Sequence, residues 1–72
     1  MSEYLSEREK ISMLPLIEYL REHAVLDNSK GRELTGKASA TVRRYLIRLC
    51  DIGLLTAHGS TKNMIYKKMS DN

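Results

Sequence analysis

Residues 32–46, RELTGKASATVRRYL, predict two helices joined by a tight turn. Gly36 stands where helices commonly end in a left-handed residue. After the turn, three apolar side chains recur at the i, i+4, i+7 spacing of one buried helix face; they are Val42, Leu46 and Leu49. We therefore predict a short helix over about 29–35 and a longer helix over about 39–52.

A further helix precedes this pair. From Ile11 onward, apolar side chains recur at three- and four-residue steps, as in a helix with one buried face. These side chains are Met13, Ile17, Leu20 and Ala24, with Leu14 and Leu16 widening the stripe. Because proline is tolerated in the first turn of a helix, Pro15 predicts a start near residues 12–14. We expect this helix to end near His23.

Ser6 and Glu9 have the spacing of a capping box, which predicts a separate short helix in a lead-in segment over residues 1–10. The folded domain is then expected over residues 11–72. Val25 and Leu26, between the first two helices of that domain, form a single strand-like pair.

Two strand-length apolar runs, 54–57 and 64–67, follow the helices. The polar connection between them, residues 58–63, is typical of a hairpin loop. The order helix, short helix, tight turn, helix and hairpin predicts a mainly α domain with a small β-hairpin.

This order resembles a winged helix-turn-helix domain. The resemblance rests on RELTG at 32–36, TVRRYL at 41–46 and LCDIGLL at 49–55, and it extends over about residues 11–69. These stretches are similar to the C-terminal winged modules of bacterial Fic-type proteins and of Schlafen/AlbA-type regulators. The resemblance implies a three-helix winged helix-turn-helix fold and a DNA-binding module of a bacterial-type transcriptional regulator. The helix over about 39–52 would dock in the major groove, with the 54–69 hairpin as wing.

Two positions depart from the family pattern. Ala38 stands where such domains usually have a serine N-cap, and Ser39 follows one residue later, which predicts a helix start shifted by one residue. Gly31 stands where relatives tend to carry a larger side chain, which predicts a loosely packed supporting helix.

Charge is unevenly distributed along the chain. Residues 1–29 hold three basic against six acidic side chains, a net of −3, whereas residues 30–72 hold nine basic against three acidic, a net of +6. The second half has the sign expected for a polyanionic partner. Charge by itself favours the simpler alternative of a solvated surface.

The candidate DNA contacts come from the longer helix, the turn before it and the hairpin. They are Lys37, Ser39, Ala40, Thr41, Arg43, Arg44, Arg48 and Lys62. Arginine can bind guanine with two hydrogen bonds, which makes Arg43 the candidate base contact. Arg44, Arg48 and Lys62 are candidate phosphate contacts. The alternatives are local ion pairs such as Arg48 with Asp51, and simple helix capping for residues 39–41.

The chain is short, with 72 residues and 8.3 kDa, so it has room for one domain and little room for an active-site cleft. Its one cysteine, Cys50, forms no internal disulfide and fits a reducing compartment, so we expect a cytoplasmic protein. Its apolar runs are far shorter than the roughly 20 residues that cross a bilayer.

The sequence contains no spacing typical of a metal site, a nucleophile elbow or a phosphate-binding glycine loop. We therefore expect no enzyme activity, cofactor or metal, and we expect double-stranded DNA as the partner. The alternative function is a protein-interaction or dimerisation winged helix within a larger protein. Its partners would be a second copy of the chain or other domains of a longer parent chain.

Overall fold

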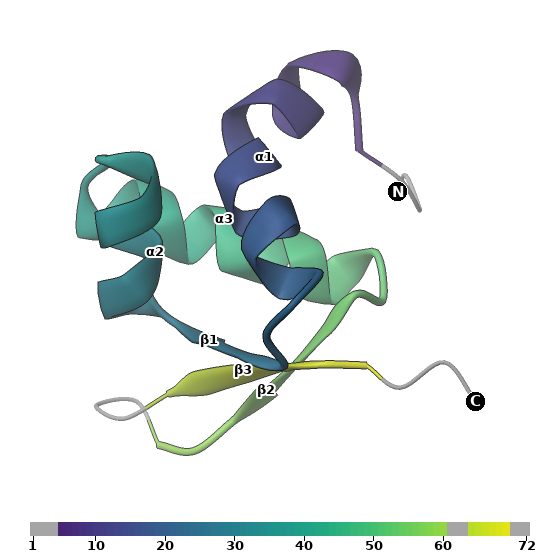
Figure 1. The fold of residues 1–72 in the computed structure, drawn as a ribbon. Helices are drawn as coiled ribbons and strands as arrows, with labels where there is room; N and C mark the ends of the chain where they lie inside the picture. The colour runs from purple at the N-terminus through teal and green to yellow at the C-terminus, as the bar shows by residue number, and fades with distance from the viewer. Residues whose placement is uncertain (1–4, 61–63, 70–72) are drawn as a thin grey trace.

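The computed structural model describes residues 5–60 and 64–69 (Figure 1). The elements in chain order are α1 (Glu7–Leu20), β1 (Val25–Asp27), α2 (Asn28–Thr35), α3 (Ser39–Asp51), β2 (Leu55–His58) and β3 (Ile65–Lys68). Three helices and a small antiparallel sheet confirm the predicted fold class, a mainly α, three-helix winged helix-turn-helix.

The sheet has three strands, one more than the predicted hairpin. β3 lies between the other two and pairs antiparallel with both, in the order β1-β3-β2. The central residue of this arrangement is Tyr66, which lies opposite Leu26 on one side and Ala57 on the other. The strand-like pair at Val25 and Leu26 is therefore an edge strand that ties the α1–α2 connection to the wing.

The hairpin strands each begin one residue later than predicted. Leu54 is not in β2, because its backbone N–H donates to the carbonyl of Leu49 at 2.9 Å and so belongs to the turn that closes α3. His58 is the last residue of β2, so the connection between the strands is residues 59–64.

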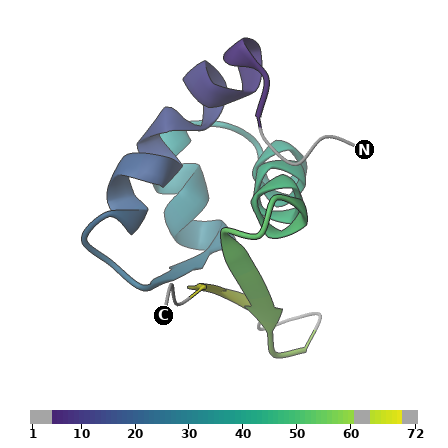
Figure 2. The ribbon, with the colours of Figure 1, turned by 90° about the vertical axis from the view of Figure 1, so that its right-hand side faces the viewer.

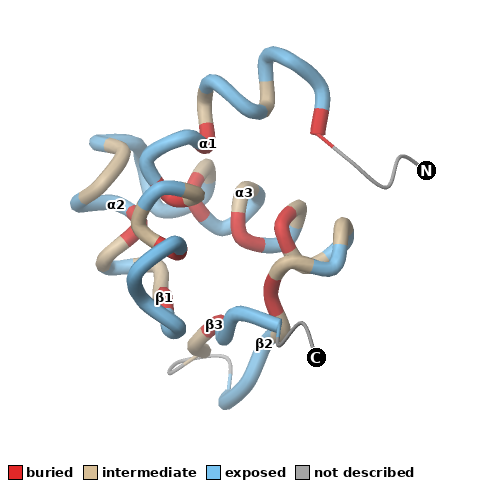
Figure 3. The backbone as a smooth tube through the Cα atoms, turned by 45° about the vertical axis from the view of Figure 1, so that its right-hand side comes forward, coloured by how far each residue is buried: buried red, intermediate tan, exposed pale blue. Residues whose placement is uncertain are grey.

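The core lies where the three helices meet the sheet (Figure 3). Its buried side chains, among the described residues, are Leu5, Met13, Leu16, Leu20, Leu26, Val42, Leu46, Leu49, Leu55 and Tyr66. The predicted buried face of α3 is confirmed in full. The predicted face of α1 is partly wrong. Leu16, predicted only to widen the stripe, is fully buried, whereas Ile17 is half-buried, Leu14 is 49% exposed, and Ala24 is exposed beyond the end of the helix.

α1 is one helix from Glu7 to Leu20, so the predicted start at 12–14 is wrong. The capping box that we assigned to a separate short helix caps this one: the backbone of Glu9 donates to Ser6 Oγ at 3.2 Å, and the backbone of Ser6 donates to Glu9 Oε1 at 2.9 Å. Pro15 lies inside the helix. It removes the hydrogen bond to the carbonyl of Ile11, a residue that is 70% exposed, so water can replace the missing donor.

The end of α1 also differs from the prediction, at Leu20 instead of near His23. The backbone N–H groups of Arg21 and Glu22 bond three residues back, which tightens the chain into a turn. Lys68 of β3 donates from Nζ to the carbonyl of Leu20 at 2.9 Å. A cation at this position satisfies an orphan carbonyl and complements the helix dipole.

Local signals set the ends of α2 and α3. Asp27 caps α2 by accepting the backbone N–H of Lys30 at 2.8 Å. Gly36 ends α2 with φ 72°, a left-handed conformation that glycine adopts without strain. α3 starts at Ser39 with Ala38 as its N-cap, so the predicted one-residue shift does not occur.

Gly31 lies at the crossing of α2 and α3, where it is buried. A Cβ atom at this position would come within 2.5 Å of Val42 Cγ1 and 3.7 Å of Leu16 Cδ2. The prediction of a loosely packed supporting helix is wrong, because the missing side chain lets the two helices approach closely.

Candidate nucleic-acid interface

α3 and the hairpin lie on the same side of the molecule, and α1 lies on the opposite side (Figure 2). The outward face of α3 is the one opposite its buried stripe. Its exposed residues are Ala40, Arg43, Arg44, Ile47 and Asp51. A ligand that met this face would therefore also lie close to the wing.

Arg43 and Arg44 carry the positive charge of this face. Both side chains are exposed, and within residues 5–60 and 64–69 neither forms an ion pair with a carboxylate. Lys37 is exposed in the turn before α3, where its backbone N–H donates to Thr35 Oγ1 at 3.2 Å. These three cations are positioned to neutralise phosphates without first breaking a salt bridge in the described part of the chain.

The first turn of α3 is tied to the first turn of α2. Ser39 Oγ donates to Asn28 Oδ1 at 3.0 Å, and Asn28 Nδ2 donates to the Ser39 carbonyl at 3.1 Å. The hydroxyl proton of Ser39 is therefore used within the fold. Ala40 is exposed, whereas Thr41 is half-buried. Because Ala38 provides no side-chain cap, the amides of this turn depend on other acceptors, such as water or a phosphate.

Arg48 lies at the margin of the interface, where α1 binds it. Its Nε donates to Glu9 Oε2 at 3.0 Å, and the two side chains are 19% and 35% exposed. Arg48 therefore has a structural role in joining α1 to α3. A phosphate contact by this arginine would have to share it with Glu9.

Glu9 joins the cap of α1 to α3 through its two oxygens. The pKa of Glu9 is lowered from its ordinary value by two hydrogen bonds to its carboxylate. The larger effect comes from the backbone N–H of Ser6, and the next from the Arg48 guanidinium. A lowered pKa in the folded state means that the ionised carboxylate favours folding. This contribution is present above the unfolded pKa and is lost as the pH falls through the lowered folded pKa.

We predict that Glu9→Gln flattens the loss of stability in acid. Glutamine keeps the capping-box geometry but removes the charge, so the variant should be less stable than wild type at pH 7, with the difference shrinking as the pH falls below the ordinary range of a glutamate. Urea denaturation at several pH values measures this. Glu22→Gln is the control, because Glu22 is exposed and has no ion pair in the described part of the chain. An equal acid response in both variants would contradict the role of Glu9.

The pKa of the Cys50 thiol is raised, mainly by burial and to a smaller extent by the carboxylate of Asp51. The side chain is half-buried against the core. A thiol in this environment is held in its neutral form, so it behaves as a small apolar side chain and not as a reactive group.

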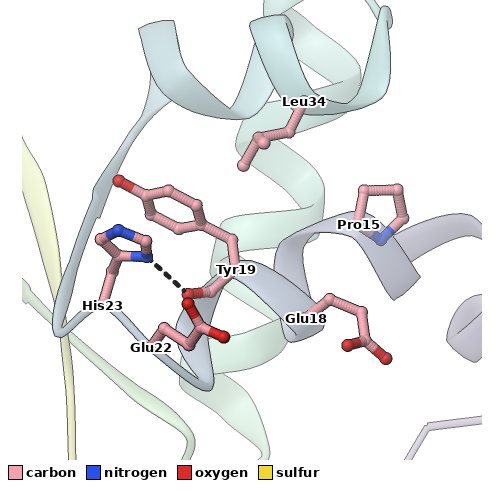
Figure 4. A pocket seen from close by; sticks show the side chains of 6 residues that line it. All are labelled: Pro15, Glu18, Tyr19, Glu22, His23 and Leu34. Atoms are coloured by element: carbon pink, nitrogen blue, oxygen red, sulfur yellow. Dashed lines mark hydrogen bonds between the residues drawn. The ribbon is translucent and has the colours of Figure 1, made fainter.

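A second candidate site is an open hollow of about 420 Å³ between α1 and α2 (Figure 4). The rings of Tyr19 and His23 stack there with centroids 4.1 Å apart, and Lys30 Nζ lies 5.7 Å from the Tyr19 ring centroid. The remaining lining side chains are Pro15, Glu18, Glu22 and Leu34. With two carboxylates among six residues, this hollow does not suit a polyanion.

Part of the hairpin connection lies outside the described residues. His58, the last residue of β2, and Ser60, within the connection, are both exposed. Lys62, the predicted phosphate contact of the wing, lies outside the described residues, as do Thr61 and Asn63.

No family model, curated protein or solved structure matches this chain. Within the described residues, no group of three His, Cys, Asp or Glu side chains is placed to hold a metal ion. No helix in that part of the chain has the length and apolar character needed to cross a membrane.

Three residues that shape this interface were not predicted from the sequence. Ile47 lies on the outward face of α3 and is 46% exposed. The sequence indicates its exposure only in that it falls outside the buried stripe of Val42, Leu46 and Leu49. Asn28 bonds to Ser39, 11 positions later, and nothing in the sequence pattern indicates this contact. The partner of Arg48, Glu9, is 39 positions away, and periodicity within one helix carries no information about it.

Proposed function

We propose that this domain is the DNA-binding module of a cytoplasmic transcriptional regulator of bacterial type. In this proposal α3 enters the major groove of double-stranded DNA and the β2–β3 hairpin flanks it as the wing. The observation that carries the proposal is the outward face of α3, where Arg43 and Arg44 stand exposed on the same side as the hairpin.

The roles of the cations follow from their positions. Arg43 lies in the N-terminal half of α3, the part of a recognition helix that usually reaches base edges, so it is the proposed base contact. Arg44 and Lys37 are the proposed phosphate contacts. Arg48 is a weaker contact than the sequence suggested, because Glu9 already neutralises it.

The test is a fluorescence anisotropy titration of a labelled duplex at several salt concentrations. Replacing both Arg43 and Arg44 with alanine should reduce the magnitude of the slope of log K against log salt by about one, since Arg44 is the proposed phosphate contact of the pair and each phosphate contact contributes roughly 0.9. The affinity at about 50 mM salt should fall by roughly tenfold or more, in the range given by losing charged contacts.

A matched control removes the same charge from the other side of the molecule. Lys10 on α1 and Arg21, the C-cap residue of α1, are both exposed, so Lys10→Ala with Arg21→Ala has the same net charge as the α3 double variant. The proposal expects the control to retain nearly all of the wild-type affinity. Equal losses in both double variants, or no duplex binding by wild type at micromolar protein, would overturn it.

A protein-interaction function is the second candidate, and the hollow between α1 and α2 is the observation that favours it. Exposed Ile11 and Leu14 lie on α1 beside Pro15, which lines the hollow. Apolar side chains beside carboxylates suit a protein partner better than DNA. Failure of duplex binding, together with a dimer in light scattering that Leu14→Glu dissociates, would support this candidate.

A further inference from the structure

The outward face of α3 has an apolar residue among its charges. Ile47 is 46% exposed. The apolar side chains of α3 that point inward, Val42, Leu46 and Leu49, are fully buried. The exposed part of the Ile47 side chain gains nothing from packing and keeps apolar surface in contact with water. Binding to an apolar group of a ligand would remove that surface from water.

The position of Ile47 on the helix is central to the proposed interface. Ile47 is four residues after Arg43 and three after Arg44, so both arginines are its neighbours on the helix surface. It is also seven residues, or about two turns, after Ala40, which places the two on nearly one line along the helix. The long arginine side chains can reach outward to either side of this line, while the short side chains on it face the floor of the groove.

The floor of the major groove has one kind of apolar group. The edges of guanine, cytosine and adenine show hydrogen-bond donors and acceptors there, and only thymine adds a methyl group at C5. Isoleucine has no hydrogen-bonding atom in its side chain, so it cannot pair with the polar edges and would leave them unsatisfied.

We propose that Ile47 is a specificity-determining residue that contacts the C5 methyl group of a thymine. This inference rests on the proposed function and names the base that one position of α3 selects. It adds an apolar contact to the arginine contact proposed for Arg43, so the preferred site contains a thymine within a few base pairs of the position that Arg43 contacts.

The test compares thymine with deoxyuridine, which lacks only the methyl group. Selection from random duplexes first gives the preferred site, and each thymine of that site is then replaced singly by deoxyuridine. Wild type should lose about fourfold in affinity at one position, the effect of one buried methyl group. Ile47→Ala should bind the thymine duplex more weakly by a similar or larger factor and should show no difference between the two bases at that position.

Leu14→Ala is the matched control, because Leu14 is an apolar side chain of similar exposure, 49%, on α1. It should keep the wild-type ratio of thymine to deoxyuridine affinity. If wild type binds the duplex with equal affinity at every thymine and deoxyuridine, or if Ile47→Ala keeps the wild-type ratio, the inference is wrong while DNA binding stands. If no duplex binds at all, the proposed function fails as well.

Discussion

Replacing Leu46 with alanine is expected to lower the free energy of unfolding by about 2–5 kcal/mol. Leu46 lies in the middle of α3 with no exposed surface, in the cluster that α1 and the sheet complete. Alanine would leave a cavity that the neighbouring side chains can fill only in part. In a domain of this size such a loss is a large fraction of the total stability. Urea denaturation followed by circular dichroism measures it.

The adjacent residue provides the control. Ile47→Ala deletes a side chain of the same size from the same helix, but from a position that is 46% exposed. Its cost should stay below about 1 kcal/mol, because little apolar burial is lost and alanine has the higher helix propensity. Similar losses in the two variants would mean that the buried stripe of α3 does not stabilise the fold as described.

The sequence predicted α3 and α2 well because their signals are local. The Val42, Leu46 and Leu49 spacing identifies the buried face of α3, and Gly36 identifies the end of α2. The exposure of Arg43 and Arg44 follows from the same pattern, since they fall on the opposite side of the helix. This part of the candidate interface could therefore be predicted without a structure.

The elements that could not be predicted depend on contacts between distant residues. β1 forms because β3, about 40 positions later, pairs with it, so three residues form a strand that their own pattern barely indicates. α1 tolerates Pro15 in its interior because the capping box and the buried Met13, Leu16 and Leu20 hold the helix on both sides of it. The predicted start near residues 12–14 used only the position of Pro15 along the chain and so did not take these stabilising contacts into account.

The same limit applies to charge. Counting basic residues in the second half of the chain treats Arg43, Arg48 and Lys68 as equal. In the structure, Glu9 binds Arg48, and Lys68 donates to the carbonyl of Leu20, 48 positions earlier. Charge available to a ligand is therefore more concentrated on α3 and its preceding turn than the count of basic residues indicates.

At Gly31 the prediction from the sequence was wrong in direction, because it expected loose packing where the helices pack closely. A missing side chain inside a helix usually weakens it, and replacing glycine with alanine in an exposed helix gains about 1 kcal/mol. At Gly31, the new methyl group would lie 2.5 Å from Val42 Cγ1. Valine in a helix has essentially one side-chain rotamer, and Val42 is fully buried, so it cannot turn away.

Gly31→Ala is therefore expected to lower the free energy of unfolding by about 1–3 kcal/mol, the usual cost of overpacking. The cause can be isolated by measuring the substitution in wild type and in a Val42→Ala background by urea denaturation. Because Val42→Ala removes the atom that clashes, Gly31→Ala should become neutral or stabilising there, following its helix propensity. The same cost in both backgrounds would place the cause outside this contact.

Val42 immediately precedes Arg43, so any shift of α3 that relieves the clash also moves the proposed base contact. In an otherwise wild-type background, Gly31→Ala should therefore weaken duplex binding under conditions where the domain remains folded.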